Sequence, residues 1–428
     1  MAGRLKSGCR VRHADVTLVH RLICQLHMRQ CTGLSAVEIA LALLCHRRYT
    51  SPLPMQGTQS WRRRSVIVSS LILLVVCLGL GVLLEPKCLA AVAEQPSNLV
   101  PLPFLVFVAY EILVILHHLA RILVAELVGL KLLAFACGPF AIRRIRNRTR
   151  FSWNNRETMI AGTTVFAPET LDGLRWRCIW LIASGPVAMI LVGFIFLVIV
   201  RAIDPARASI DTLFLAAIAF IGIADGVRLL LPLALRRSAS YGVLLWDAIR
   251  GRPTTEVLFL ISALIHEGQQ GIRPRDWSSQ MLNLALNLTE NTELAERVTV
   301  CLLEFYRTAD LHEMQVAARY LSEAVEKVNP KSETLFAWVM LEKAFYEAWS
   351  KRDEPAARAA FERVQDWSRV PHHAWLRVSA AMALLEGKPE ECQRQAREAL
   401  NILQSMPVVH ELAVDWLEEL LASSEVRC

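Results

Sequence analysis

The arrangement of the apolar residues constrains the fold more than any other feature of this sequence. Residues 65–84 form a run of 20 residues without a charged side chain, bounded by Arg64 and Glu85. A helix of that length crosses the ~30 Å hydrocarbon core of a bilayer. Three further apolar blocks follow at residues 98–124, 178–200 and 211–235. Blocks of this length predict an integral, multi-pass membrane protein with about four transmembrane helices. Such a protein contacts the membrane lipid bilayer directly.

Composition agrees with this prediction and excludes several classes of protein. Hydrophobic residues make up 54% of the 428 residues and charged residues 20%, below the ~25% that is usual in soluble domains. Disordered, collagen-like and water-soluble single-domain chains are therefore excluded. The net charge of +7 does not indicate nucleic-acid binding, because the basic residues flank the apolar blocks instead of forming a patch with aromatics. The 11 cysteines include no CxxC pair, which favours a reduced setting.

Charges between the apolar blocks predict the orientation of the chain. Residues 131–177 hold nine Lys and Arg against three acids, whereas residues 85–98 hold one Lys and two Glu. Because positively charged loops stay inside, we expect the N-terminus, residues 131–177 and the C-terminal region to be cytoplasmic. The basic N-terminal segment, residues 1–64, has 11 Lys and Arg against two acids and does not read as a signal peptide. Met55 is an alternative start, so the place of residues 1–54 in the mature chain stays open.

The chain changes character after residue 253. From residue 254 to 428, apolar positions recur at helical spacing and charges return, which predicts a cytoplasmic domain of amphipathic helices. Two of its turns, Asp353-Glu354-Pro355 and Gly387-Lys388-Pro389, lie 34 residues apart, which is the tetratricopeptide period. We expect an irregular stack of helical hairpins that holds a protein partner on its concave face. The predicted helices cover residues 311–328, 334–350, 354–364, 374–385 and 389–403.

Several ionisable and small residues interrupt the predicted spans. Ionisable residues inside a bilayer are costly, so each one is a functional candidate. The second span contains Leu116-His117-His118-Leu119-Ala120-Arg121 and is followed by a stretch that ends in Gly138-Pro139-Phe140. The third begins with Ala183-Ser184-Gly185-Pro186-Val187-Ala188-Met189, and the fourth is followed by Ser240-Tyr241-Gly242.

In this order the motifs resemble those of the site-2 protease family of membrane-embedded zinc metalloproteases. That family has an H-E-x-x-H helix, a small stretch ending in G-P, a G-P-L-A-N helix and a later D-G. The resemblance covers roughly residues 100–253 and rests on the order of four weak motifs. It implies an all-α membrane core of about four transmembrane helices, and zinc-dependent cleavage of membrane-anchored proteins. The predicted domains are then a basic segment at 1–64, a site-2-protease-like domain at 65–253 and the helical-repeat domain.

The departures from the family pattern fall on its chemical positions. His117 takes the first zinc-ligand position and is kept, but His118 stands at the position of the glutamate base. Arg121 stands at the second ligand position, and Tyr241 at the position of the D-G aspartate. Arginine keeps its proton and offers no lone pair to a metal. Met189 replaces the asparagine of the G-P-L-A-N helix.

These replacements predict a degenerate site. If zinc binds at all, the side chains left to hold it are His117, His118 and Asp225, with Glu111 a further candidate. We expect instead an ion-paired cluster without metal, in which Arg121 pairs with Glu111, Glu126 or Asp225, and Asp225 pairs with Arg228 at i, i+3.

Three functions follow from these alternatives. The first is a proteolytically inactive scaffold that binds a membrane helix or regulates a membrane-anchored protein. The second is an active intramembrane metalloendopeptidase with a non-standard zinc site. The third is a membrane anchor whose helical repeats alone carry the function.

Overall fold

The computed structural model describes residues 80–81, 101–145, 148–153, 162–204, 209–232, 241–290, 295–364, 366–405 and 411–425. These residues form a mostly helical chain with thirteen α-helices and one small sheet. The predicted basic segment and the first predicted span lie outside the described residues, except for Leu80 and Gly81.

Three described helices are long and apolar enough to cross a membrane: α4 (Leu102–Leu127), α6 (Leu174–Ala202) and α7 (Ile210–Leu230). They match the predicted second, third and fourth spans with shifted ends. Helix α4 begins after Pro101, and Pro103 lies in its first turn, where a proline is tolerated because no intrahelical bond from its nitrogen is needed. Helix α7 ends five residues earlier than expected, since Pro232 disfavours helical geometry at Leu231.

Helices α6 and α7 pack closely through small residues. A Cβ atom added at Gly222 of α7 would lie 2.8 Å from the Met189 carbonyl oxygen and 3.0 Å from the Gly193 Cα of α6. One turn later, a Cβ at Gly226 would lie 2.8 Å from the Pro186 carbonyl oxygen. This small-xxx-small spacing lets the two backbones touch, which is how helices associate in lipid.

A four-stranded antiparallel sheet connects α4 to α6, so the expectation of an all-α core is wrong. Its strands are β1 (Leu130–Cys137), β2 (Phe140–Ile145), β3 (Arg148–Trp153) and β4 (Thr163–Pro168), in the order β3-β2-β1-β4. Gly138, at a φ of +54°, makes the turn between β1 and β2. Four of the nine basic residues that were expected to form a loop lie on β2 and β3: Arg143, Arg144, Arg148 and Arg150.

The C-terminal half consists of helical hairpins. Its helices follow a short connector, α8 (Tyr241–Ile249), and neighbours such as α11 and α12 or α15 and α16 pack side by side. The predicted helices between residues 311 and 403 are present within a few residues of their expected ends. The helices are α9 (Thr254–Gln269), α10 (Ser279–Thr289), α11 (Ala295–Asp310), α12 (Met314–Lys327), α13 (Glu333–Tyr346), α14 (Glu354–Glu362), α15 (His372–Leu385), α16 (Pro389–Gln404) and α17 (Glu411–Glu425).

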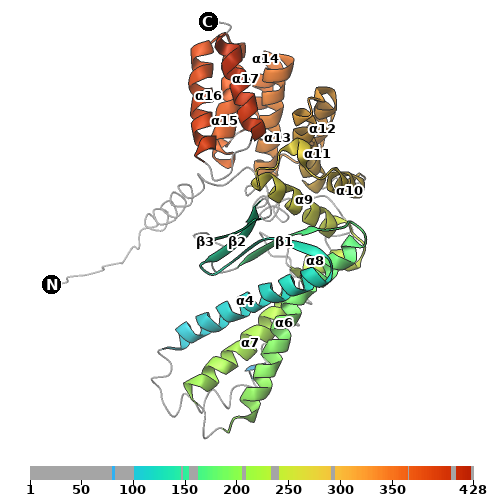
Figure 1. Cartoon of the computed structure of the whole chain (residues 1–428), viewed down its shortest axis with the longest axis vertical. Helices are drawn as coiled ribbons and strands as arrows, with labels where there is room; N and C mark the ends of the chain where they lie inside the picture. Colours follow the sequence, from blue (N-terminus) through green and yellow to red (C-terminus); the bar gives the residue numbers. More distant parts are fainter. Residues whose placement is uncertain are drawn as a thin grey trace, which may run out of the picture.

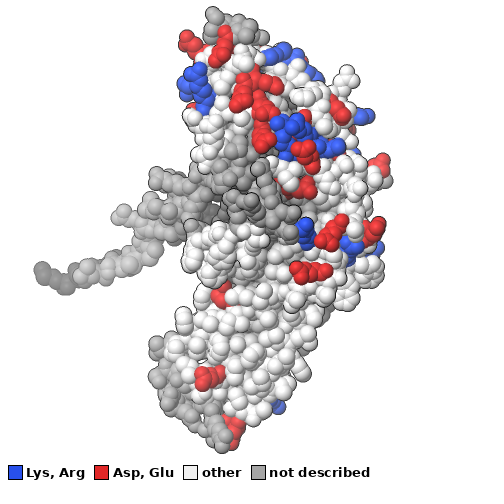
Figure 2. Space-filling view, viewed as in Figure 1, with Lys and Arg blue, Asp and Glu red and all other residues white. Residues whose placement is uncertain are grey.

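The sheet lies between the three apolar helices and the helical hairpins (Figure 1). Helix α9 packs on β4 and on α8, so the sheet and the C-terminal half lie at the same end of the apolar helices. Charged side chains crowd the surface over the C-terminal hairpins, whereas the surface over α4, α6 and α7 is nearly free of them (Figure 2). This division agrees with a membrane-spanning part made of α4, α6 and α7 and a water-facing part made of the C-terminal hairpins.

Candidate functional site

The candidate site lies on the buried face of α4. Ala109, Leu113, His117, Arg121 and Ala125 are buried at four-residue intervals, so they form one stripe along the helix. His117 and Arg121 are therefore neighbours on one face, as their spacing predicts. Both side chains are almost fully enclosed, at 5% and 8% exposure.

Arg121 contacts the residue at the start of α8. Its Nη1 donates a hydrogen bond to the Tyr241 hydroxyl at 3.0 Å, across 120 residues of sequence. The guanidinium carbon also lies 5.2 Å from the Tyr241 ring centre and 5.6 Å from that of Phe166 on β4. Both distances suit a cation–π interaction. The arginine is thus held by one hydroxyl and two aromatic rings.

The two histidines fit against glycines on neighbouring elements. The His117 ring lies 5.4 Å from the Tyr241 ring and 5.1 Å from the His118 ring. A Cβ added at Gly185 on α6 would overlap the His117 ring, and one added at Gly162 before β4 would overlap the His118 ring. His118 Nδ1 lies 3.5 Å from the Thr164 hydroxyl. Only glycine allows the helix and the strand to approach these rings so closely.

The carboxylates are placed differently from the expected cluster. Asp225 and Arg228 form an ion pair at 2.5 Å within α7. Among the residues that the structure describes, no ion pair joins Arg121 to Glu111, Glu126 or Asp225. On α4, three buried side-chain atoms have no hydrogen-bond partner among the described residues: Glu111 Oε1, His117 Nδ1 and Arg121 Nε. The tyrosine hydroxyl takes the place that we expected a carboxylate to take beside Arg121.

The described residues do not fit the zinc site that the resemblance implies. No three His, Cys, Asp or Glu side chains among them converge on one point. The guanidinium of Arg121 lies beside His117, where a second neutral ligand would be needed, and it supplies a positive charge instead of a lone pair. Tyr241 comes close to His117, but its hydroxyl is engaged by Arg121. Met189, at the family's asparagine position, is buried.

Sequence reasoning missed the contribution of the sheet to this site. Phe166 and Thr164 come from β4, and Gly162 directly precedes it. Thr163-Thr164-Val165-Phe166 does not alternate polar and apolar residues, so no strand period marks this segment in the sequence. No protein-family model matches the chain, and neither curated proteins nor solved structures include a match.

Proposed function

We propose that this chain is a proteolytically inactive membrane protein related to the site-2 proteases, in which Arg121 replaces the metal charge. Such a protein would hold a membrane-anchored partner without cutting it. The contact between Arg121 and Tyr241 is the observation that carries this proposal. Both residues stand at positions where the family pattern requires zinc ligands, and they meet although 120 residues separate them.

Electrostatics supports a structural role for Arg121. A charged side chain in the middle of a membrane helix costs about 2.5–3.5 kcal/mol or more. The hydrogen bond to Tyr241 and the two ring contacts offset part of that cost. A dication at the same place would be repelled by the guanidinium, so zinc chemistry and Arg121 exclude each other.

The remaining surfaces favour a scaffold with partners in two places. The outward face of α4 is apolar, with Phe107, Leu119 and Leu123 between 47% and 65% exposed, as expected for contact with lipid or with a membrane helix. The helical hairpins follow directly after α8 and α9 on the side of the sheet. We assign this side to the cytoplasm, because the strands β2 and β3, which carry four basic residues, lie there.

Metal analysis of the detergent-purified full chain tests the proposal. We expect no stoichiometric zinc in the wild type and no cleavage of membrane-anchored test substrates. The repaired variant His118→Glu/Arg121→His/Tyr241→Asp restores the family's ligands and base, and we expect it to retain zinc. The matched control is His118→Glu/Tyr241→Asp/Arg228→His, which keeps Arg121. We expect this control to bind no zinc.

Two results would contradict the proposal. Stoichiometric zinc in the wild type that disappears in His117→Ala would identify an active-type metal centre and favour the metalloendopeptidase alternative. A repaired variant that folds but gains no zinc would show that positions 117, 121 and 241 are not equivalent to the family's ligands.

A further inference from the structure

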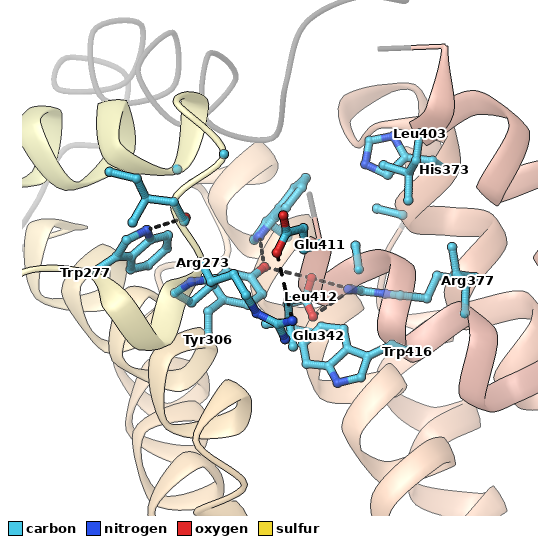
Figure 3. Close-up of a pocket in the computed structure, with 18 residues that line it drawn as sticks. Arg273, Trp277, Tyr306, Glu342, His373, Arg377, Leu403, Glu411, Leu412 and Trp416 are labelled. Atoms are coloured by element: carbon cyan, nitrogen blue, oxygen red, sulfur yellow. Dashed lines mark hydrogen bonds and ion pairs between the residues drawn. The ribbon is translucent and has the colours of Figure 1, made fainter. Parts of the chain in front are cut away.

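The helical hairpins enclose a cavity that is separate from the polar cluster on α4. Its volume is about 110 Å³. It lies where the loop after α9 meets α11, α13, α15, α16 and α17, so six segments share its wall (Figure 3). A partly open hollow lined by convergent side chains is a usual form of a small-molecule site.

The wall of the cavity is mainly aromatic and aliphatic. Trp277, Trp338 and Trp416 are each less than 10% exposed, and Tyr306 joins them. Leu403 and Leu412 complete the apolar surface. Rings pack well against such a wall in edge-to-face or offset arrangements. The lining therefore favours an aromatic ligand over a flexible polar one.

The polar groups in the wall neutralise one another. Glu342 accepts hydrogen bonds from Arg377 Nη2 at 2.6 and 2.7 Å and from the Tyr306 hydroxyl at 2.8 Å. Trp338 Nε1 in turn donates to the Tyr306 hydroxyl at 2.8 Å. Burial, together with the neighbouring Glu342, raises the pKa of Tyr306 well above its usual value, so its hydroxyl stays protonated. Within this network the charges of Glu342 and Arg377 cancel, so the network itself does not attract an ion.

A charged ligand would meet further opposition. The Arg377 guanidinium carbon already lies 4.4 Å from the Phe345 ring centre and 4.9 Å from that of Trp416, so it occupies the ring faces that a cation would use. An anion would face the carboxylate of Glu342, which is 1% exposed and paired with Arg377. The Glu342–Arg377 pair therefore favours neither sign of charge, and a neutral ligand fits beside it best.

One hydrogen-bond donor in the wall is unused by the described residues. Arg377 Nε is buried and has no hydrogen-bond partner among them, although the side chain is only 6% exposed. A buried donor without a partner is costly, and an acceptor on a ligand would remove that cost. The volume of about 110 Å³ is of the same order as the roughly 150 Å³ of an engineered apolar cavity that binds benzene, which suits one small ring.

An ion-pair network ties the rim of the cavity together. Arg273, in the loop after α9, pairs with Asp310 of α11 at 2.5 Å and with Asp415 of α17 at 2.6 Å. Glu411, at the start of α17, lies 3.9 Å from the same guanidinium. These ion pairs connect the loop after α9 to α17 beside the cavity.

We propose that this cavity binds a small neutral molecule built on one aromatic ring and carrying a single hydrogen-bond acceptor. Neither the degenerate protease site nor its function is needed for this inference. The ring would lie among the tryptophans, and its acceptor would bond to Arg377 Nε.

Isothermal titration of the full detergent-solubilised chain with four matched probes tests the proposal. Acetophenone has the ring and the acceptor, toluene lacks the acceptor, and benzoate and benzylamine carry charge. We expect saturable binding of acetophenone, about tenfold weaker binding of toluene for the loss of one hydrogen bond, and no saturable binding of the two ions.

Two variants localise the binding. Ala413→Leu fills the cavity from α17 and should abolish binding of acetophenone, whereas Ala422→Leu, at an exposed position of the same helix, should leave it unchanged. The pair Arg377→Met/Glu342→Met removes the donor and its counter-charge together, and should lower acetophenone binding to the level of toluene. If Ala413→Leu does not fold, Ala374→Leu fills the space from α15 instead.

Three outcomes would overturn the proposal. They are absence of saturable acetophenone binding to the wild type, equal binding to a folded cavity-filling variant, and binding of benzoate or benzylamine as tight as that of acetophenone.

Discussion

Arg121 is a permanent cation whose donors are only partly used by the described residues. It donates one hydrogen bond, to Tyr241, and its Nε has no partner among them. The two aromatic rings beside it contribute attraction without accepting a conventional hydrogen bond. The Tyr241 hydroxyl should therefore matter more for stability than an ordinary tyrosine hydroxyl.

Replacing Tyr241→Phe tests the contribution of this hydroxyl. The ring stays, the acceptor is lost, and we expect the free energy of unfolding to fall by about 1–3 kcal/mol. Tyr110→Phe on α4 is the matched control, because no hydrogen bond joins its hydroxyl to another described residue, and its effect should stay within about 0.5 kcal/mol. Denaturant unfolding in detergent, followed by circular dichroism, measures both. Equal losses in the two variants would contradict the assigned role.

At the scale of elements, glycines set the distance between α6 and α7. The backbone atoms that face Gly222 cannot move aside as a flexible side chain can. The same closeness recurs where Gly185 and Gly162 meet the two histidines. Close approach at glycines therefore adds to the side-chain packing that holds the membrane helices around the site.

Gly222→Ala should force these helices apart. The added carbon would lie 2.8 Å from a carbonyl oxygen of α6, and overpacking of this kind typically costs about 1–3 kcal/mol. Gly81→Ala is the control, since its added carbon meets nothing within 4 Å. Melting temperatures in detergent compare the two. A drop no larger for Gly222→Ala than for Gly81→Ala would refute the close contact.

The sequence predicted elements well where their periodicity is long. Hydropathy located α4, α6 and α7, and the helical period located helices such as α12 and α16 to within a few residues. The sheet was missed because Arg148–Trp153 alternates basic with other residues, and this pattern was interpreted as a loop that carries orientation charge. For the site, the four-residue spacing placed His117 beside Arg121. The approach of β4, by contrast, depends on tertiary packing that no local pattern encodes.

At the scale of the whole molecule, the chain separates into an apolar part and a charged part (Figure 2). The end of α6 and the start of α7, which the loop after α6 joins, lie at the end of the apolar helices opposite to the sheet and the hairpins (Figure 1). If α4, α6 and α7 cross a membrane, the loop after α6 lies on one side of it, and the sheet and the helical hairpins lie on the other side.

Reporter fusions in a bacterial host test the orientation. Alkaline phosphatase inserted after Asp204 should be active, because that loop would face the periplasm. Green fluorescent protein inserted after Glu425 should fluoresce, because the hairpins would face the cytoplasm. Exchanging the two reporters is the control and should silence both. Active phosphatase at both positions would contradict the arrangement.

Helix α8 has a mechanical consequence. Tyr241 begins this helix, Arg175 of α6 donates hydrogen bonds to the carbonyl oxygens of Ala248 and Ile249 at its other end, and Thr255 of α9 donates to its Leu244 carbonyl oxygen. The nine residues of α8 thus form a short rigid helix that is hydrogen-bonded at both of its ends. If the C-terminal helical hairpins tilt relative to the apolar helices, either the Tyr241 hydroxyl moves or one of the hydrogen bonds from Arg175 and Thr255 to α8 breaks.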